Sequence, residues 1–372
     1  MEKDSAIRNF SFVGIGKIVT IALQALFYLL FASILGPGNY GQLSVIIALA
    51  GTTSTISRLG LNVSLQVYQA KEKSELIQRI KTLFLLSTAI GAIVLLPISI
   101  IVSMLCIGLS FFAMTQAEHL GLRKYKQFMI SNVLRGGLFF VLPFILYFIM
   151  EIPGIVLGFA IANLVSSIPL MKTIKIQSFI PLKSNFKALA QNYLLDSAGS
   201  LWFMSDKLII ASFFSLTIVG IYQFNLQVLF ALTVLPAILS SYLITEESVG
   251  ITHGKINRLT IIASIVLVIV SIIASPYFVN SLFSKYSEGI FPLQILLVTI
   301  IPLTLSSIFE SKLLSMESKK IWLVPTVKTG ILFILLVILS QFYELVGMSL
   351  AILISSSIGT ILGYIFIKKL KN

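Results

Sequence analysis

The chain has 372 residues, of which 57% are hydrophobic and only 11% are charged, and its mean hydropathy is +1.00. A soluble domain carries roughly a quarter charged residues, so this composition excludes an ordinary soluble protein and indicates one that lies in a lipid bilayer. The formal net charge of +13 does not come from a basic patch within a polar surface, which argues against a nucleic-acid-binding protein.

The first half of the chain contains enough apolar sequence for six spanning helices, each of about 20 residues. The segment 82–116 is an uncharged run of 35 residues between two basic segments, so we expect two short helices there with a turn near Pro97-Ile98-Ser99. The other predicted helices of this half cover residues 10–35, 40–62, 128–150 and 154–171.

The second half repeats this rhythm after a basic linker, with predicted helices at 189–213, 220–243, 259–279, 290–309, 321–340 and 345–367. We therefore expect an all-α integral membrane protein with twelve transmembrane helices in two six-helix lobes around a central cavity. The N-terminal lobe is 1–175, the cytoplasmic linker is 176–187, and the C-terminal lobe is 188–372. An even number of helices per lobe predicts parallel repeats with the substrate site between them.

The distribution of lysine and arginine predicts the orientation. With these helices, 21 of the 27 cations lie on the side of the two termini, and Lys285 alone lies on the other side. The positive-inside rule then places both termini in the cytoplasm. We expect no cleavable signal peptide, because the first apolar run is too long for a signal core and ends at Gly-Pro-Gly.

Residues for enzymatic or metal chemistry are scarce. The predicted external loops are short and carry no carboxylate pair, which argues against a membrane glycosyltransferase or polymerase. The single cysteine, Cys106, excludes an intrachain disulfide, and neither His119 nor His253 has a second ligand at metal-binding spacing. We expect a transporter with no metal and no cofactor. A non-transporting scaffold for a glycan-assembly complex is an alternative function that the sequence leaves open.

Five cations fall within the predicted helices, where a charge at the bilayer centre costs about 2.5–3.5 kcal/mol. Two acids in the seventh helix, Asp196 and Asp206, are the counter-ions that the sequence offers, so we expect a net positive cavity that binds an anion. The alternatives are that the long side chains reach the lipid interface or that polar side chains bond between helices. The candidate substrate-binding cations are Lys17, Arg58, Arg135, Lys207 and Lys328.

Polar side chains recur at helical spacing beside these charges, and a polar stripe on a spanning helix faces protein or water rather than lipid. Asp196 and Asp206 are candidate ion-coupling residues, with the alternative that Asp196 simply pairs with a nearby cation. The candidate cavity-lining residues are Gln24, Tyr28, Asn62, Asn192 and Ser200.

Two short segments resemble a known family. Arg8-Asn9 with a polar first helix and Leu-Gly-Pro-Gly-Asn-Tyr-Gly at 35–41 resemble the start of polysaccharide-biosynthesis membrane proteins of the O-antigen and capsule flippase type. These proteins belong to the multidrug/oligosaccharidyl-lipid/polysaccharide exporter superfamily. Asp-Lys-Leu-Ile-Ile at 206–210 with Val-Gly-Ile-Tyr at 219–222 is similar to the same family's helix 7 and 8 region. The two turn regions also share a faint pattern, Asn-Tyr-Gly-Gln at 39–42 against Gly-Ile-Tyr-Gln at 220–223.

The resemblance implies a flippase in the bacterial inner membrane that moves an undecaprenyl-diphosphate-linked oligosaccharide to the external leaflet by alternating access. It also implies a proton or sodium ion for coupling, and a polysaccharide polymerase and chain-length regulator as partners. In such a site Arg58 and Arg135 would bind phosphate oxygens bidentately, and the lysines would act as point charges. A multidrug exporter of the same superfamily is the alternative, ranked lower because cationic drugs favour an acidic cavity.

Overall fold

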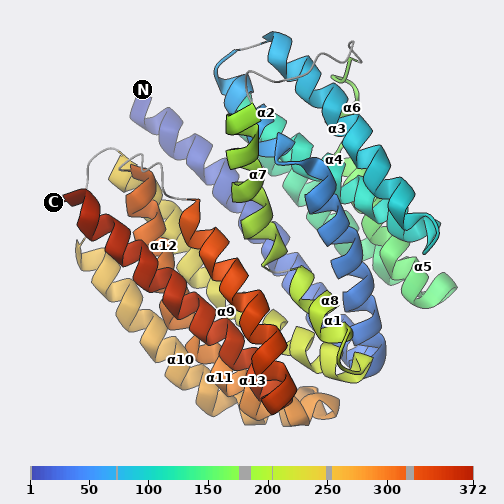
Figure 1. The fold of residues 1–372 in the computed structure, drawn as a ribbon, viewed down its shortest axis with the longest axis vertical. Coiled ribbons are helices and arrows are strands. Elements are labelled where there is room, and N and C mark those ends of the chain that lie inside the picture. Colours follow the sequence, from blue (N-terminus) through green and yellow to red (C-terminus); the bar gives the residue numbers. More distant parts are fainter. Residues whose placement is uncertain are drawn as a thin grey trace. The chain divides into compact units, whose positions relative to one another are not determined.

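The structure is a computed structural model, and it describes residues 2–72, 74–175, 186–202, 204–248, 254–315 and 322–371. The elements within these ranges are helices, which confirms the all-α prediction (Figure 1). The first half contains α1 (Glu2–Arg58), α2 (Leu61–Ala70), α3 (Ser74–Leu95), α4 (Ile100–Gly121), α5 (Tyr125–Ser166) and α6 (Ile168–Met171). The second half contains α7 (Phe186–Leu201), α8 (Ser205–Ala211), α9 (Leu216–Ser248), α10 (Gly254–Leu282), η2 (Ser284–Gly289), α11 (Ile290–Val298), α12 (Ile300–Ser315) and α13 (Leu323–Lys371).

Eight helices in the described ranges are long and apolar enough to cross a membrane, so the protein is a multi-pass membrane protein. Three of them, α1, α5 and α13, contain a sharp turn, at Gly36, Glu151 and Glu344 respectively, where φ is positive. These turns fall at the predicted boundaries between spans. The number of twelve transmembrane crossings and the location of both termini in the cytoplasm stay predictions, because helix length tests neither.

The turn expected at 97–99 is confirmed, because α3 ends at Leu95 and α4 begins at Ile100. The Oγ of Ser99 accepts a hydrogen bond from the backbone N–H of Ile101, an N-cap that starts α4. The expected start of this helix at residue 82 is wrong, since α3 begins at Ser74. The helix extends through the basic segment because Lys81 is buried against protein rather than left in water.

The chain forms two compact units. Unit 1 comprises residues 1–24 and 45–205, and unit 2 comprises residues 25–44 and 206–372. The tip of the hairpin within α1 therefore belongs to unit 2, while the rest of α1 belongs to unit 1. The expected lobes 1–175 and 188–372 stay a prediction, and most of the expected linker, 176–185, lies outside the described residues.

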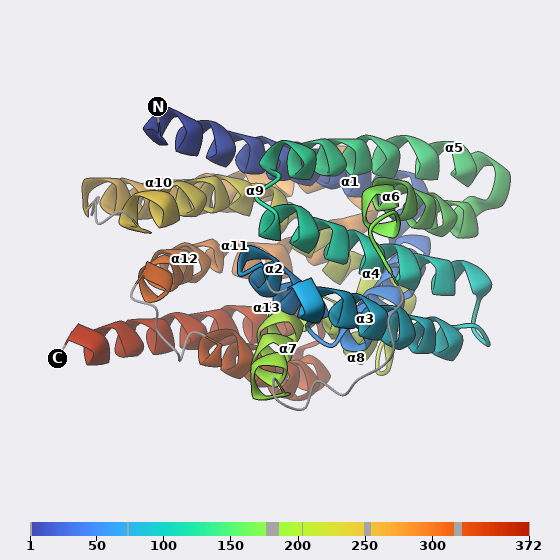
Figure 2. The ribbon, with the colours of Figure 1, turned by 90° about the horizontal axis from the view of Figure 1, so that it is seen from above.

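In unit 1, α4 packs against α2, α3, α5 and α6, and α2 also contacts α7. Figure 2 shows α3, α4 and α5 running lengthwise beside one another. A cluster of apolar side chains fills the space between α2, α3 and α4, and its fully buried members include Leu65, Phe84 and Met114. This packing holds the short helix α2 against the long helices α3 and α4.

In unit 2, α12 contacts α9, α10 and α13, and α11 packs between α10 and α13. One face of α10 exposes large apolar side chains, among them Leu259 at 65% and Ile273 at 64% of their accessible surface. An exposed apolar face of this extent is what a lipid-facing helix requires.

The hairpins within α5 and α13 share a repeat that the sequence analysis missed. The turn residue is Glu151 in one and Glu344 in the other, and a glycine follows three residues later in both. A Cβ on Gly154 would stand 2.1 Å from the carbonyl oxygen of Leu146, and a Cβ on Gly347 would stand 1.9 Å from that of Leu339. The spacing Leu-x4-Glu-x2-Gly is the same in both, so the two halves end on the same tight helical hairpin.

Candidate substrate site

Arg58 lies at the centre of a polar cluster in unit 1. Its Nη2 donates to Oδ2 of Asp196 at 3.2 Å, and its Nη1 donates to Oγ of Ser54 at 3.0 Å. Nδ2 of Asn62 donates to the other oxygen of Asp196, Oδ1, at 2.8 Å. The side chains of Arg58 and Asp196 are only 8% and 10% exposed, so a charged pair is held almost completely out of solvent.

The turn between α1 and α2 brings these residues together. Leu59 and Gly60 both adopt positive φ, 54° and 66°. The resulting turn ends α1 at Arg58 and starts α2 just before Asn62. A Cβ on Gly60 would stand 2.5 Å from the backbone N and Cα of Tyr193 in α7. Glycine is therefore needed here both for its backbone conformation and for the close approach of α7, which carries Asp196.

Two further side-chain contacts fix α7 and the start of α8 within unit 1. Nδ2 of Asn192 donates to Oγ of Ser64 at 2.9 Å, and the hydroxyls of Thr52 and Ser205 lie 3.2 Å apart. Ser200 lies half-buried on α7. The predicted residues Arg58, Asn62, Asn192 and Asp196 thus lie in one connected polar region.

Arg135 occupies a second place in unit 1, on α5. Its Nε donates to Oδ1 of Asn163 at 2.8 Å, and its guanidinium carbon lies 4.5 Å from the ring centre of Phe112 and 5.4 Å from that of Phe139. When the amide oxygen of Gln24 faces Arg135, it accepts from Nη1 and Nη2 at 3.2 and 3.3 Å. Neutral amides and ring faces therefore hold this cation, and the structure brings together Gln24, a predicted lining residue, and Arg135, a predicted substrate-binding cation.

In unit 2, Asp206 is enclosed by its own neighbours. Its Oδ1 accepts from Nζ and from the backbone N–H of Lys207, both at 2.9 Å, and its Oδ2 accepts from the hydroxyl of Tyr222 at 2.8 Å. The residues Asp206, Lys207 and Tyr222 are at most 5% exposed. Asp206 and Lys207 thus neutralise each other rather than presenting separate charges to a cavity.

Lys328 lies half-buried on α13 in unit 2. Its Cδ is 3.2 Å from the position that a Cβ on Gly359 would take, and the charge of Glu310 on α12 acts on it electrostatically. Glu310 in turn accepts a hydrogen bond from the Oγ of Ser306 at 2.8 Å.

Tyr28, also in unit 2, packs edge-on against Phe27 with ring centres 5.7 Å apart. The side chain of Lys17 lies outside the described residues.

The two acids that were predicted within a helix each meet one of the predicted cations. Both acids are ion-paired, Asp196 with Arg58 and Asp206 with Lys207. A further pair, Lys81 and Glu118, is also buried, with 2.5 Å between Nζ and Oε1. Neither residue was among the charges predicted within the helices. A buried charge costs less free energy when it is paired, and each of these three pairs joins one cation to one acid.

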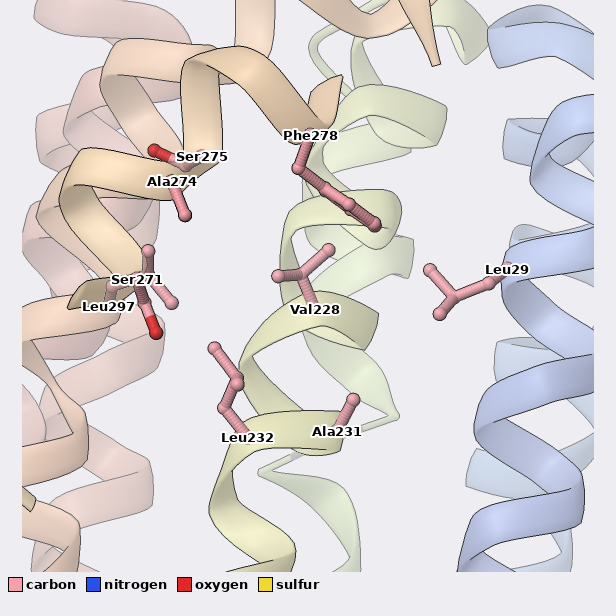
Figure 3. A pocket seen from close by; sticks show the side chains of 9 residues that line it. All are labelled: Leu29, Val228, Ala231, Leu232, Ser271, Ala274, Ser275, Phe278 and Leu297. Atoms are coloured by element: carbon pink, nitrogen blue, oxygen red, sulfur yellow. The ribbon is translucent and has the colours of Figure 1, made fainter. Parts of the chain in front are cut away.

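Unit 2 also contains an apolar pocket of about 230 Å³. Figure 3 shows its walls, formed by α1, α9, α10 and α11, with the ring of Phe278 projecting between Val228 and Leu29. Seven of its nine lining residues are apolar, and the other two are serines. The lining residues are Leu29, Val228, Ala231, Leu232, Ser271, Ala274, Ser275, Phe278 and Leu297. Such a lining suits a hydrocarbon and offers almost nothing to a charged group.

Comparisons with known proteins fit this architecture. Residues 6–120 match the model of a family described as polysaccharide biosynthesis protein. This match confirms the family resemblance for the first third of the chain. A search of the curated proteins gives no match. The identified family segment contains α1 to α4 almost completely, including Arg58 and Asn62.

Solved structures with the same fold are transporters. The lipid II flippase MurJ, in an inward closed conformation, matches with a TM-score of 0.76 and 14% identity over 96% of this chain and 87% of that one. A MOP superfamily transporter from Pyrococcus furiosus, described as having a binding pocket of reverse polarity, matches with a TM-score of 0.65 and 14% identity over 98% and 96%. An outward-facing multidrug resistance transporter of the MATE family matches with a TM-score of 0.61 and 14% identity over the same shares. The chain has the fold of MOP superfamily transporters.

Proposed function

We propose that this protein is a flippase that moves an undecaprenyl-diphosphate-linked oligosaccharide, such as an O-antigen or capsule repeat unit, across the bacterial inner membrane by alternating access. The observation that carries the proposal is the buried Arg58 cluster of unit 1, in a chain whose first third matches a polysaccharide biosynthesis family. A diphosphate is the part of this substrate that a buried guanidinium recognises, because planar N–H groups match phosphate oxygens.

Arg58 retains capacity to bind such a group. Its Nε is buried and donates to no described atom, and Oδ1 of Asn62 is likewise buried without a described donor. A phosphate oxygen beside Arg58 would accept the Nε–H bond, and a sugar or phosphate hydroxyl could donate to Asn62. Buried polar groups left unsatisfied cost free energy, so binding a ligand with matching groups is favoured.

Asp196 competes with a bound diphosphate for the same guanidinium. Loss of the negative charge of Asp196 would leave Arg58 available for phosphate, and its return would restore the pair and release the anion. This competition would link the charge state of Asp196 to substrate binding and release. It makes Asp196, rather than the enclosed Asp206, the coupling residue that we propose.

The apolar pocket of unit 2 would bind a portion of the isoprenoid chain of the substrate. This binding site is independent of the Arg58 cluster. A cavity of roughly 150 Å³ holds a six-carbon benzene ring, so about 230 Å³ suits roughly two five-carbon isoprene units. The seven apolar lining residues and the lipid-facing helix α10 favour the prenyl chain over a polar ligand.

Binding measurements on the purified full-length protein test the proposal. We expect undecaprenyl diphosphate to bind more tightly than undecaprenol, and Arg58→Gln to abolish that difference. A Thr52→Ala variant, which alters a neighbouring hydroxyl but no charge, should keep it. Equal affinity for the two lipids, or tighter binding of a cationic dye than of either, would reject the diphosphate site and favour the multidrug exporter.

A further inference from the structure

Five side chains of unit 1 form a polar ladder between α1, α4 and the two arms of α5. These side chains, the amide ladder, are Gln24, Gln116, Asn132, Arg135 and Asn163. At the first rung, Nδ2 of Asn132 donates to Oε1 of Gln116 on α4 and to the carbonyl oxygen of Phe128. The hydroxyl of Thr20 on α1 donates to the carbonyl oxygen of Asn132 at 2.9 Å and so holds α1 against this rung.

The second rung lies one helical turn from the first, because Arg135 follows Asn132 by three residues on α5. Nε of Arg135 donates to Oδ1 of Asn163 at 2.8 Å, and its Nη1 and Nη2 donate to the amide oxygen of Gln24 when that oxygen faces it. Nδ2 of Asn163 in turn donates to the carbonyl oxygen of Phe159 at 2.7 Å, which fixes this amide with its oxygen toward Arg135. The two rungs thus bring four amides and one guanidinium together within one unit.

Two buried groups at the ladder bond to no described atom. Nε2 of Gln116 is buried without an acceptor among the described residues, although Oε1 of the same amide is bonded to Asn132. The hydroxyl of Ser166, three residues after Asn163 on α5, is buried in the same way. Because a buried polar group without a hydrogen bond costs free energy, both groups favour a ligand that bonds to them.

Three members of the ladder keep part of their surface exposed. Gln24, Gln116 and Arg135 are half-buried rather than fully enclosed. A polar side chain on a spanning helix contacts protein or water and not lipid, so the exposed parts of these three residues face water. A polar ligand that enters the protein from water can therefore reach them.

The oxygen atoms of the ladder decide which ligand fits it. Asn163 and Gln24 both direct an amide oxygen at Arg135, so a phosphate group would meet acceptors that repel its oxygens. A phosphate diester offers acceptors only, whereas each sugar hydroxyl both donates and accepts. Hydroxyl groups therefore match the amides, which also carry both functions, better than a phosphate does.

We propose that the amide ladder is a saccharide subsite, in which Gln24, Gln116 and Arg135 bind hydroxyl groups of the sugar attached to the diphosphate. Nε2 of Gln116 donates to one hydroxyl oxygen, and the amide oxygen of Gln24 accepts from a neighbouring hydroxyl. The inference rests on the proposed function, because it assigns the sugar of the substrate whose diphosphate Arg58 would bind. The ladder and the Arg58 cluster both belong to unit 1.

Binding of two lipids to the purified full-length protein tests the subsite. The native protein should bind undecaprenyl diphosphate carrying one N-acetylglucosamine roughly tenfold more tightly than undecaprenyl diphosphate alone. Gln24→Leu and Gln116→Leu should each remove most of that preference and leave the affinity for the bare lipid unchanged. Thr20→Val is the matched control, because it removes a hydrogen bond between the same helices but no ladder amide, and it should keep the preference.

Equal binding of the two lipids by the native protein, or an unchanged preference in both glutamine variants, would overturn the proposal. An equal loss of preference in Thr20→Val would also overturn it, because helix packing would then be the cause. If the native protein binds neither lipid, the proposed function is wrong, and free N-acetylglucosamine decides the subsite. This sugar should then raise the unfolding temperature of the native protein and of Thr20→Val but not of Gln116→Leu. An unchanged unfolding temperature of the native protein would refute the subsite.

Discussion

Nη2 of Arg58 lies 3.2 Å from Oδ2 of Asp196, although 138 residues separate the two in the chain. The pair joins the end of α1 to the middle of α7, and Asn62 at the start of α2 holds the same carboxylate. One buried ion pair therefore links three segments of unit 1 and supplies both the phosphate-binding group and the competing carboxylate of the proposed mechanism.

The stability of unit 1 should depend on both members of this pair. Arg58→Gln leaves Asp196 buried without its cation, which we expect to cost about 3–5 kcal/mol in the free energy of unfolding. Arg58→Gln with Asp196→Asn removes both charges and should recover most of that loss without restoring transport. Thermal unfolding in detergent measures both effects. A double variant no more stable than the single one would show that the pair is not the cause.

Asp196→Asn imitates the protonated carboxyl group while still accepting the hydrogen bond from Asn62. Because it removes the competitor of the substrate for Arg58, we expect it to tighten binding of undecaprenyl diphosphate by roughly tenfold. Titration of the lipid against both proteins provides the measurement, and unchanged affinity would contradict the proposed competition.

The buried pair of Lys81 and Glu118 should act as a structural clamp. Nζ of Lys81 also donates to Oγ1 of Thr173, just after α6, so the pair ties α3 and α4 to the end of the first half. Lys81→Met is expected to destabilise the protein by about 3–5 kcal/mol. Lys71→Met, at an exposed position, is the control and should leave the unfolding temperature unchanged. Equal behaviour of the two variants would show that the clamp contributes nothing.

The repeated hairpins should tolerate no side chain at their glycines. Gly154→Ala and Gly347→Ala place a Cβ about 2 Å from a carbonyl oxygen, so both should lower the unfolding temperature. Gly137→Ala has open space around the added Cβ and, by reducing the freedom of the unfolded chain, should stabilise the protein by about 0.4–1 kcal/mol. Destabilisation by Gly137→Ala alone would contradict this account of the hairpins.

The apolar pocket should matter for long prenyl chains. Ala231→Phe and Ala274→Phe fill the pocket from two walls, and we expect them to slow translocation of an undecaprenyl substrate more than that of a short-chain analogue (Figure 3). Ala263→Phe enlarges an exposed position on the same α10 and should have no effect. An equal loss with both chain lengths would assign the pocket a packing role instead.

Part of this architecture could be predicted from the sequence. Charged residues mark the ends of spanning helices, and glycine or proline marks their turns, so the boundaries near Gly36, Pro97, Glu151 and Glu344 were predictable. Helical spacing predicted that Arg58 and Asn62 share a face of one helix, but α1 ends at Arg58, and the turn at Leu59 and Gly60 is what brings Asn62 to the same carboxylate.

The sequence offered a pairing of Asp196 with a nearby cation as an alternative, but the partner of each charge could not be predicted, because it depends on which distant helices pack together. Lys81 and Glu118 lie near helix ends, where a solvated position is the ordinary expectation, and only packing of α3 on α4 buries them. The Leu-x4-Glu-x2-Gly repeat was present in the sequence, but its meaning follows from the contact of each glycine with a carbonyl oxygen.

The central claim is that Arg58 binds a diphosphate during transport. Its most direct test is translocation of fluorescent undecaprenyl-diphosphate oligosaccharide in vesicles containing the purified protein, followed by loss of signal to an impermeant quencher. We expect the native protein to expose the lipid to the quencher, Arg58→Gln to be inactive, and Thr52→Ala to remain active. Full activity of Arg58→Gln in a correctly folded protein would contradict the account.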